Sequence, residues 1–81
     1  MTAKKAYEII KTKYPDLVVI ECMEFPEFYA FALTEKGKED ELVSGGYNTV
    51  NKTTGEMGGI NPIHNFEAFS TAKEIPISTL N

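Results

Sequence analysis

The chain has 81 residues, 42% of them hydrophobic and 25% charged, which is the composition of a single globular domain. Its eight basic residues are all lysines and face twelve acidic residues, giving a net charge of −4. Arginine is the preferred side chain for bidentate phosphate contacts and for reading guanine. We therefore expect no nucleic-acid partner for this acidic chain without arginine.

No apolar run approaches the roughly 20 residues that span a bilayer, so we also expect no membrane partner. The early lysines are not followed by the apolar stretch of a secretory leader, and we expect a cytoplasmic location. The single Cys22 allows no internal disulfide, which agrees with that location.

Residues 3–14 have the apolar spacing of an amphipathic helix. Its apolar stripe consists of Ala3, Ala6, Tyr7, Ile10 and Tyr14. Thr2 is suited to cap the first turn, and Pro15 ends the helix because it disfavours helical geometry at the preceding residue. The four lysines of this segment are expected on the solvated face; nucleic-acid binding through them is the weaker interpretation.

Two strands are predicted next, over residues 16–25 and 28–34, because the apolar spacing changes to a period of two. One face of the first strand carries Val18, Ile20 and Cys22. The short connection at residues 26–27 predicts an antiparallel hairpin. The three glutamates around it are interpreted as an acidic strand edge that discourages aggregation.

A charged, glycine-containing loop is predicted over residues 35–46 and is expected to be mobile. Two short strands follow, near residues 47–52 and 56–60, and form a second antiparallel hairpin.

The stretch VNKTTGEMGG contains the turn of this second hairpin. Gly55 can take the positive φ that a short hairpin loop needs. A ligand-binding role is not favoured, because the stretch lacks the phosphate-loop and calcium-loop patterns. Lys52 and Thr54 are then expected to be exposed and to contribute little to stability.

A second helix is predicted over residues 65–75. Asn61-Pro62 is one candidate start and Asn65 is a rival cap, while Pro76 disfavours helical geometry at the end. The apolar side chains near one face are Phe66, Phe69, Ala72 and Ile75. The remaining tail is expected to dock Ile75 and Ile77 on the sheet.

The resulting order, α-β-β-β-β-α, predicts a single α+β domain over residues 1–81. It has an antiparallel four-stranded sheet, with an N-terminal and a C-terminal helix covering one face. The residues predicted to be largely buried are Val18, Ile20, Phe31, Val50, Phe66 and Phe69.

Cys22 and His64 are the only residues that could act as a nucleophile and its base. Catalysis also needs a third, orienting group and a cleft, and Cys22 lies in a strand pattern where a small buried hydrophobe is expected. One cysteine and one histidine do not make a metal site. We therefore predict no catalytic residues, no metal and no cofactor, and keep a small enzyme using this pair as the alternative.

Tyr29, Phe31 and Leu33 share one face of the second strand. If both helices cover the other face, these side chains form an open apolar surface of the kind that marks an interface. The alternative is that the tail or a helix covers them, and both stay open because the strand register is not derivable from the sequence.

Four stretches of the sequence form one pattern: FYAFAL, YNTVNKTTGE, the Asn-Pro pair and FEAFSTAKEI. Over residues 5–75 this pattern resembles small uncharacterised proteins of bacteria and their prophages, which have a V-[ND]-K-x-T-G-E hairpin. It is similar in outline to immunity-protein and YrhB-type domains. The resemblance implies a compact cytosolic α+β domain, without known catalytic residues, that binds another protein or itself. The leading hypothesis is a non-enzymatic module of phage or mobile-element type, with an immunity or inhibitor protein as the candidate role.

Overall fold

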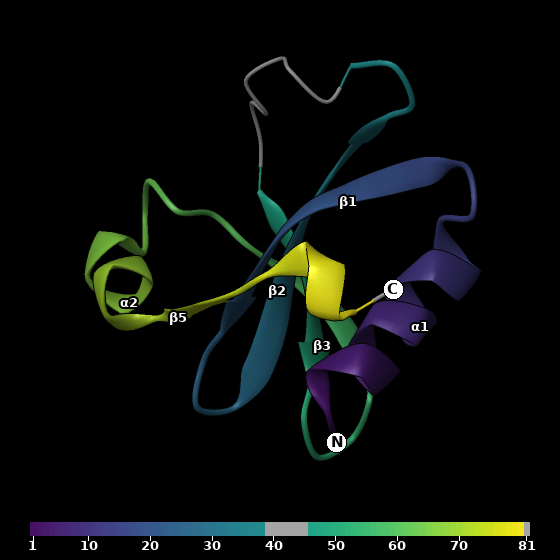
Figure 1. The fold of residues 1–81 in the computed structure, drawn as a ribbon. Helices are drawn as coiled ribbons and strands as arrows, with labels where there is room; N and C mark the ends of the chain where they lie inside the picture. The colour runs from purple at the N-terminus through teal and green to yellow at the C-terminus, as the bar shows by residue number, and fades with distance from the viewer. Residues whose placement is uncertain (39–45, 81) are drawn as a thin grey trace.

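The computed structural model of the protein describes residues 1–38 and 46–80. Along the chain the elements are α1 (Ala3–Lys13), β1 (Leu17–Glu24), β2 (Phe28–Glu35), β3 (Tyr47–Asn51), β4 (Met57–Ile60), α2 (Phe66–Thr71), β5 (Lys73–Ile75) and a 3-10 turn, η1 (Ile77–Thr79). The strands form one antiparallel sheet in the order β4-β3-β2-β1-β5. In Figure 1, α1 and α2 lie on opposite sides of the strands. The α+β class and the antiparallel pairing confirm the prediction.

Two further predictions concern the loop before β3 and the absence of a membrane span. The mobility predicted for residues 35–46 concerns residues that lie mostly outside the described part of the chain. None of the described helices is long and apolar enough to cross a membrane.

α1 forms where its apolar spacing predicts it. Thr2 is the N-cap, and its hydroxyl accepts a hydrogen bond of 3.2 Å from the backbone N–H of Lys5. Ala6 and Ile10, one turn apart on the helix, are fully buried. The backbone N–H of Tyr14 donates to the Ile10 carbonyl at 2.9 Å and closes the last turn before the proline.

The core lies between α1 and one face of the sheet, which is called the core face below. Its buried side chains are Ala6, Ile10, Val19, Cys22, Tyr29, Phe31, Val50 and Leu80. Phe31 and Val50 are 0% exposed, which confirms their predicted burial. Ile75 and Ile77 pack against the same cluster, as predicted for the tail.

A β-bulge decides which residues of β1 reach the core face. Val19 pairs with Leu33 and Glu21 with Ala32, so Ile20 is the extra residue on its strand. Because strand side chains alternate between faces, the extra residue puts Val19 and Cys22 on the same side. The prediction that Val18 and Ile20 share the buried face with Cys22 is therefore wrong: both are partly exposed, whereas Val19 is buried.

β5 takes the place of the predicted end of the second helix. The backbone of Ala72 is extended (φ −69°, ψ 148°), and residues 73–75 pair with residues 22–24 of β1. Pro76 disfavours helical geometry at Ile75, and the strand lets the Ile75 side chain pack against the core. Over the described residues the sheet therefore has five strands and not the predicted four.

α2 packs on the face opposite the core face. The Phe69 ring contacts Phe25 edge-on, with centroids 5.0 Å apart, and Tyr47 at 4.9 Å. Tyr47 is three residues from buried Val50 on β3, so alternation turns its ring away from the core face. The prediction that both helices cover one face is wrong. Phe66, predicted to be buried, is 75% exposed because the short α2 contacts the sheet through Phe69.

Candidate binding surface

Cys22, the nucleophile of the enzyme hypothesis, is fully buried in the core cluster. Burial, with smaller contributions from the charges of Glu24 and Glu21, raises the pKa of its thiol to about 12. The thiol is therefore protonated at neutral pH, which does not suit a nucleophile. His64 lies in an exposed turn ahead of α2, so the two side chains occupy different environments. Within residues 1–38 and 46–80, no three His, Cys, Asp or Glu side chains are grouped to hold a metal ion.

Tyr29, Phe31 and Leu33, the predicted interface, point to the core face. Tyr29 is 6% exposed and Phe31 is 0% exposed, and Leu33 packs against the same cluster. An interface requires exposed side chains, and α1 and the tail contribute to the cluster that encloses these two aromatic rings. Of the two alternatives left open by the sequence, coverage by a helix and the tail is the one found.

The stretch VNKTTGEMGG forms the predicted hairpin turn. The Asn51 carboxamide oxygen accepts hydrogen bonds from the backbone N–H groups of Thr53 (2.8 Å) and Thr54 (2.9 Å). The Gly55 N–H donates to the Asn51 carbonyl at 2.9 Å, and Gly55 has φ 76° as predicted. The backbone N–H groups of Thr53, Thr54 and Gly55 are therefore satisfied by Asn51 within the turn.

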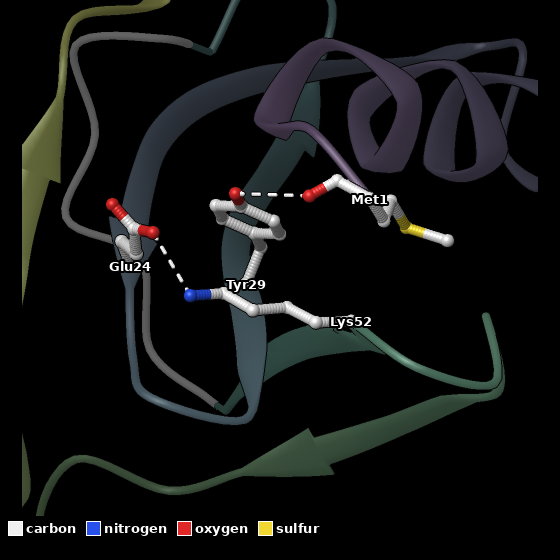
Figure 2. Close-up of polar contacts among 4 residues, drawn as sticks. All are labelled: Met1, Glu24, Tyr29 and Lys52. Carbon is white, nitrogen blue, oxygen red and sulfur yellow. Dashed lines mark hydrogen bonds and ion pairs between the residues drawn. The ribbon is translucent and has the colours of Figure 1, made fainter.

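Lys52 joins the two hairpins (Figure 2). Its ammonium lies 2.8 Å from a Glu24 carboxylate oxygen and 4.8 Å from the centre of the Tyr29 ring. The Tyr29 hydroxyl donates to the Met1 carbonyl at 3.4 Å. The hydrogen bond from Lys52 lowers the pKa of Glu24 below its usual value. The prediction of an exposed Lys52 is wrong, since its side chain is only 23% exposed, and we interpret this contact as structural.

The face opposite the core face carries exposed apolar side chains around α2. Ile63 is 82% exposed and Phe66 is 75% exposed. Beside them is a cleft of about 390 Å³, called the α2 cleft below and lined by Phe25, Pro26, Glu27, Phe28, Ile60, Asn65 and Ala68. A second hollow of about 400 Å³, which is equally open and lined by residues 63–68, adjoins it and shares Asn65 and Ala68. The α2 cleft and this hollow together are called the α2 surface.

Aromatic stacking and two asparagines hold the α2 surface in place. Phe25 and Phe28 stack with centroids 4.6 Å apart and form one wall of the cleft. Asn61 accepts a hydrogen bond from the Ile63 N–H (2.8 Å), and its carbonyl accepts one from the Asn65 side chain (2.8 Å). Of the two predicted caps, Asn65 is at the N-cap position of α2, without a side-chain cap hydrogen bond, whereas Asn61 stabilises the preceding turn and does not start the helix.

Two carboxylates line the α2 surface, and a third lies beside Tyr47. Glu27 lines the α2 cleft and Glu67 lines the adjoining hollow. The Tyr47 hydroxyl donates to a Glu21 carboxylate oxygen. Burial, the hydrogen bond to Glu21, and the charges of Glu21 and Glu74 all raise the pKa of Tyr47. Two carboxylates and no lysine therefore line this surface together with its apolar side chains.

Sequence reasoning missed this surface because it assigned Phe66 to the core on helical spacing alone. The prolines at positions 62 and 76 leave room for a helix over residues 63–75, so the sequence carries no clear signal that α2 ends at Thr71. The six-residue α2 contacts the sheet through Phe69, and the Phe66 side chain, which lies off this contact, stays exposed.

No protein-family model matches this sequence, and comparisons with curated proteins and with solved structures found no match.

Proposed function

We propose that the protein is a non-enzymatic binding domain that recognises another protein through the α2 surface. The observation that carries this proposal is the exposure of Ile63 (82%) and Phe66 (75%) beside the α2 cleft. Large apolar side chains exposed together are unfavourable in water and mark interaction surfaces. Aromatic anchors next to pockets are also the residues that dominate binding energy in protein complexes.

A cytoplasmic immunity or inhibitor protein of phage or mobile-element type is the role proposed within this class. The support is the resemblance of the hairpin and C-terminal stretches to small bacterial and prophage proteins. A small, acidic domain with an exposed apolar surface suits a role in which binding itself is the activity. The buried, protonated Cys22 argues against the alternative of a small enzyme.

The test is affinity capture from bacterial cytosol, with three baits compared by mass spectrometry. The wild-type protein should retain a partner that the double variant Ile63→Ser and Phe66→Ser loses. Both sites are exposed, so the variant should fold and melt like wild type. Met57→Ser, which removes a partly exposed apolar side chain from β4, is the matched control and should retain the partner. A partner retained by the double variant would contradict the proposal.

A further inference from the structure

The α2 surface has carboxylates but no lysine among its lining residues. Glu27 and Glu67 line the α2 surface, and Glu21 is bound to Tyr47, whose ring contacts α2. The ion pairs found in the described residues are Lys38–Glu35 and Lys52–Glu24. Neither involves a carboxylate of the α2 surface, so its negative charge is not neutralised by these pairs.

The lysines gather elsewhere. α1, which packs on the core face, carries Lys4, Lys5, Lys11 and Lys13. Lys52 is engaged by Glu24, and Lys73 also lowers the pKa of Glu24, which places its charge near the same carboxylate. No lysine lines the α2 cleft or the adjoining hollow.

Resting on the proposed function, we infer that the partner presents a positively charged segment with one aromatic or large aliphatic side chain. That side chain enters the α2 cleft between Phe28, Ile60 and Ala68. Lysine or arginine side chains on either side of it face Glu27 and Glu67. Burying the apolar group supplies most of the affinity, while the charges steer the approach and select against acidic partners.

A second copy of the chain is the other basic candidate, since α1 exposes Lys4 and Lys5. The apolar side chain beside these lysines is Met1, which is 45% exposed; its methyl group lies 3.5 Å from the Cβ position of Gly55, so only part of the side chain is open to another copy. A contact between α1 of one copy and α2 of the next also runs head to tail, and such contacts extend into chains of copies unless the rotation closes. The inference therefore commits to a different protein.

The probes are three synthetic peptides titrated into the isotopically labelled protein and followed by NMR. Their sequences are Lys-Lys-Phe-Lys-Lys, Glu-Glu-Phe-Glu-Glu and Lys-Lys-Gly-Lys-Lys. We expect saturable shifts at the α2 cleft with the first peptide alone. Raising NaCl from about 50 mM to about 500 mM should weaken this binding severalfold, because salt screens exposed charges. Equal shifts with the first two peptides, or shifts that map to α1, would overturn the inference.

Charge reversal gives the matched control. The double variant Glu27→Lys and Glu67→Lys should bind the glutamate peptide and lose the lysine peptide. Glu8→Lys, an exposed reversal on α1, should leave both results as in wild type. Unchanged preference in the double variant would overturn the inference. So would concentration-dependent self-association that 500 mM NaCl dissolves, because the complementary surface would then be another copy.

Failure of this inference is separable from failure of the proposed function. A captured partner that needs Ile63 and Phe66 but is acidic, or binds equally well in high salt, sustains the proposed function and refutes the basic segment. A captured partner that binds without these two residues refutes the surface itself.

Discussion

At the scale of single residues, Gly55 is required for its backbone. Its φ of 76° lies in the region that β-branched side chains avoid. A Cβ built there would meet only Met1 and Ile9 side-chain atoms at 3.5 Å and 4.0 Å, which are ordinary contacts. The cost of a larger residue therefore comes from backbone strain and not from a clash.

We expect Gly55→Val to lower the free energy of unfolding by about 1–3 kcal/mol. Gly55→Asn should cost much less, because asparagine tolerates positive φ. Thr54→Ala, which removes only an exposed hydroxyl that accepts from the Glu56 N–H, is the control and should change stability by under about 0.5 kcal/mol. Urea unfolding of the three variants measures this, and a wild-type stability for Gly55→Val would contradict the account.

Lys52 gives a pH-dependent prediction. Lys52→Ala should cost about 1 kcal/mol at neutral pH, because water screens a pair whose side chains are 23% and 33% exposed. Lys52→Met keeps the stem beside Tyr29 and removes the charge, so it isolates the ion pair from the packing.

The sign of the pH effect follows from the lowered pKa of Glu24. Its contribution is complete above the usual glutamate pKa of 4.5 and is lost as the pH falls through the lower folded value. The stabilities of wild type and Lys52→Met should therefore converge between about pH 5 and about pH 3. A difference that stays constant over this range would show that the ion pair contributes nothing.

At the scale of elements, the sequence predicts the helices and strands whose apolar residues recur with a clear period. α1, β1 and β2 have enough residues to display a period of 3.6 or 2, and the prolines at 15 and 26 mark the ends of α1 and β1. β3 and β4 are short, and the turn between them is the clearer signal. The bulge at Ile20 carries no glycine or other local sign, yet it exchanges the faces of β1. β5 has three residues, too few to show alternation, and overlaps a helical spacing.

The binding surface was not predictable either, because the apolar pattern of a segment does not show which of its side chains will be covered. Phe66 and Phe69 have equal apolar character in the sequence, and only the tertiary contact of Phe69 with Phe25 and Tyr47 separates them. Conversely, Tyr29 and Phe31 share an apolar strand face that predicted an interface, but both side chains are buried in the core cluster with residues of α1 and the tail. Which apolar face stays open depends on where the helices pack, and that information lies outside any single segment.

At the scale of the whole molecule, the rate at which a reagent modifies Cys22 measures how often the fold opens. It is 0% exposed, at the centre of a cluster that draws on α1, β1, β2, β3 and the tail. A reagent in water reaches the thiol only when these elements separate, and the raised pKa further keeps it in the unreactive protonated form.

We therefore expect 5,5′-dithiobis(2-nitrobenzoic acid) to label native Cys22 slowly, at a rate set by the population of opened molecules. Gly55→Val, which destabilises the fold at a distance from the thiol, should speed labelling by about tenfold for each 1.4 kcal/mol of lost stability. His64→Ala should leave the rate unchanged, because the exposed imidazole has no part in the opening. Rapid labelling of the native protein that His64→Ala slows would instead show an activated cysteine and would restore the enzyme alternative.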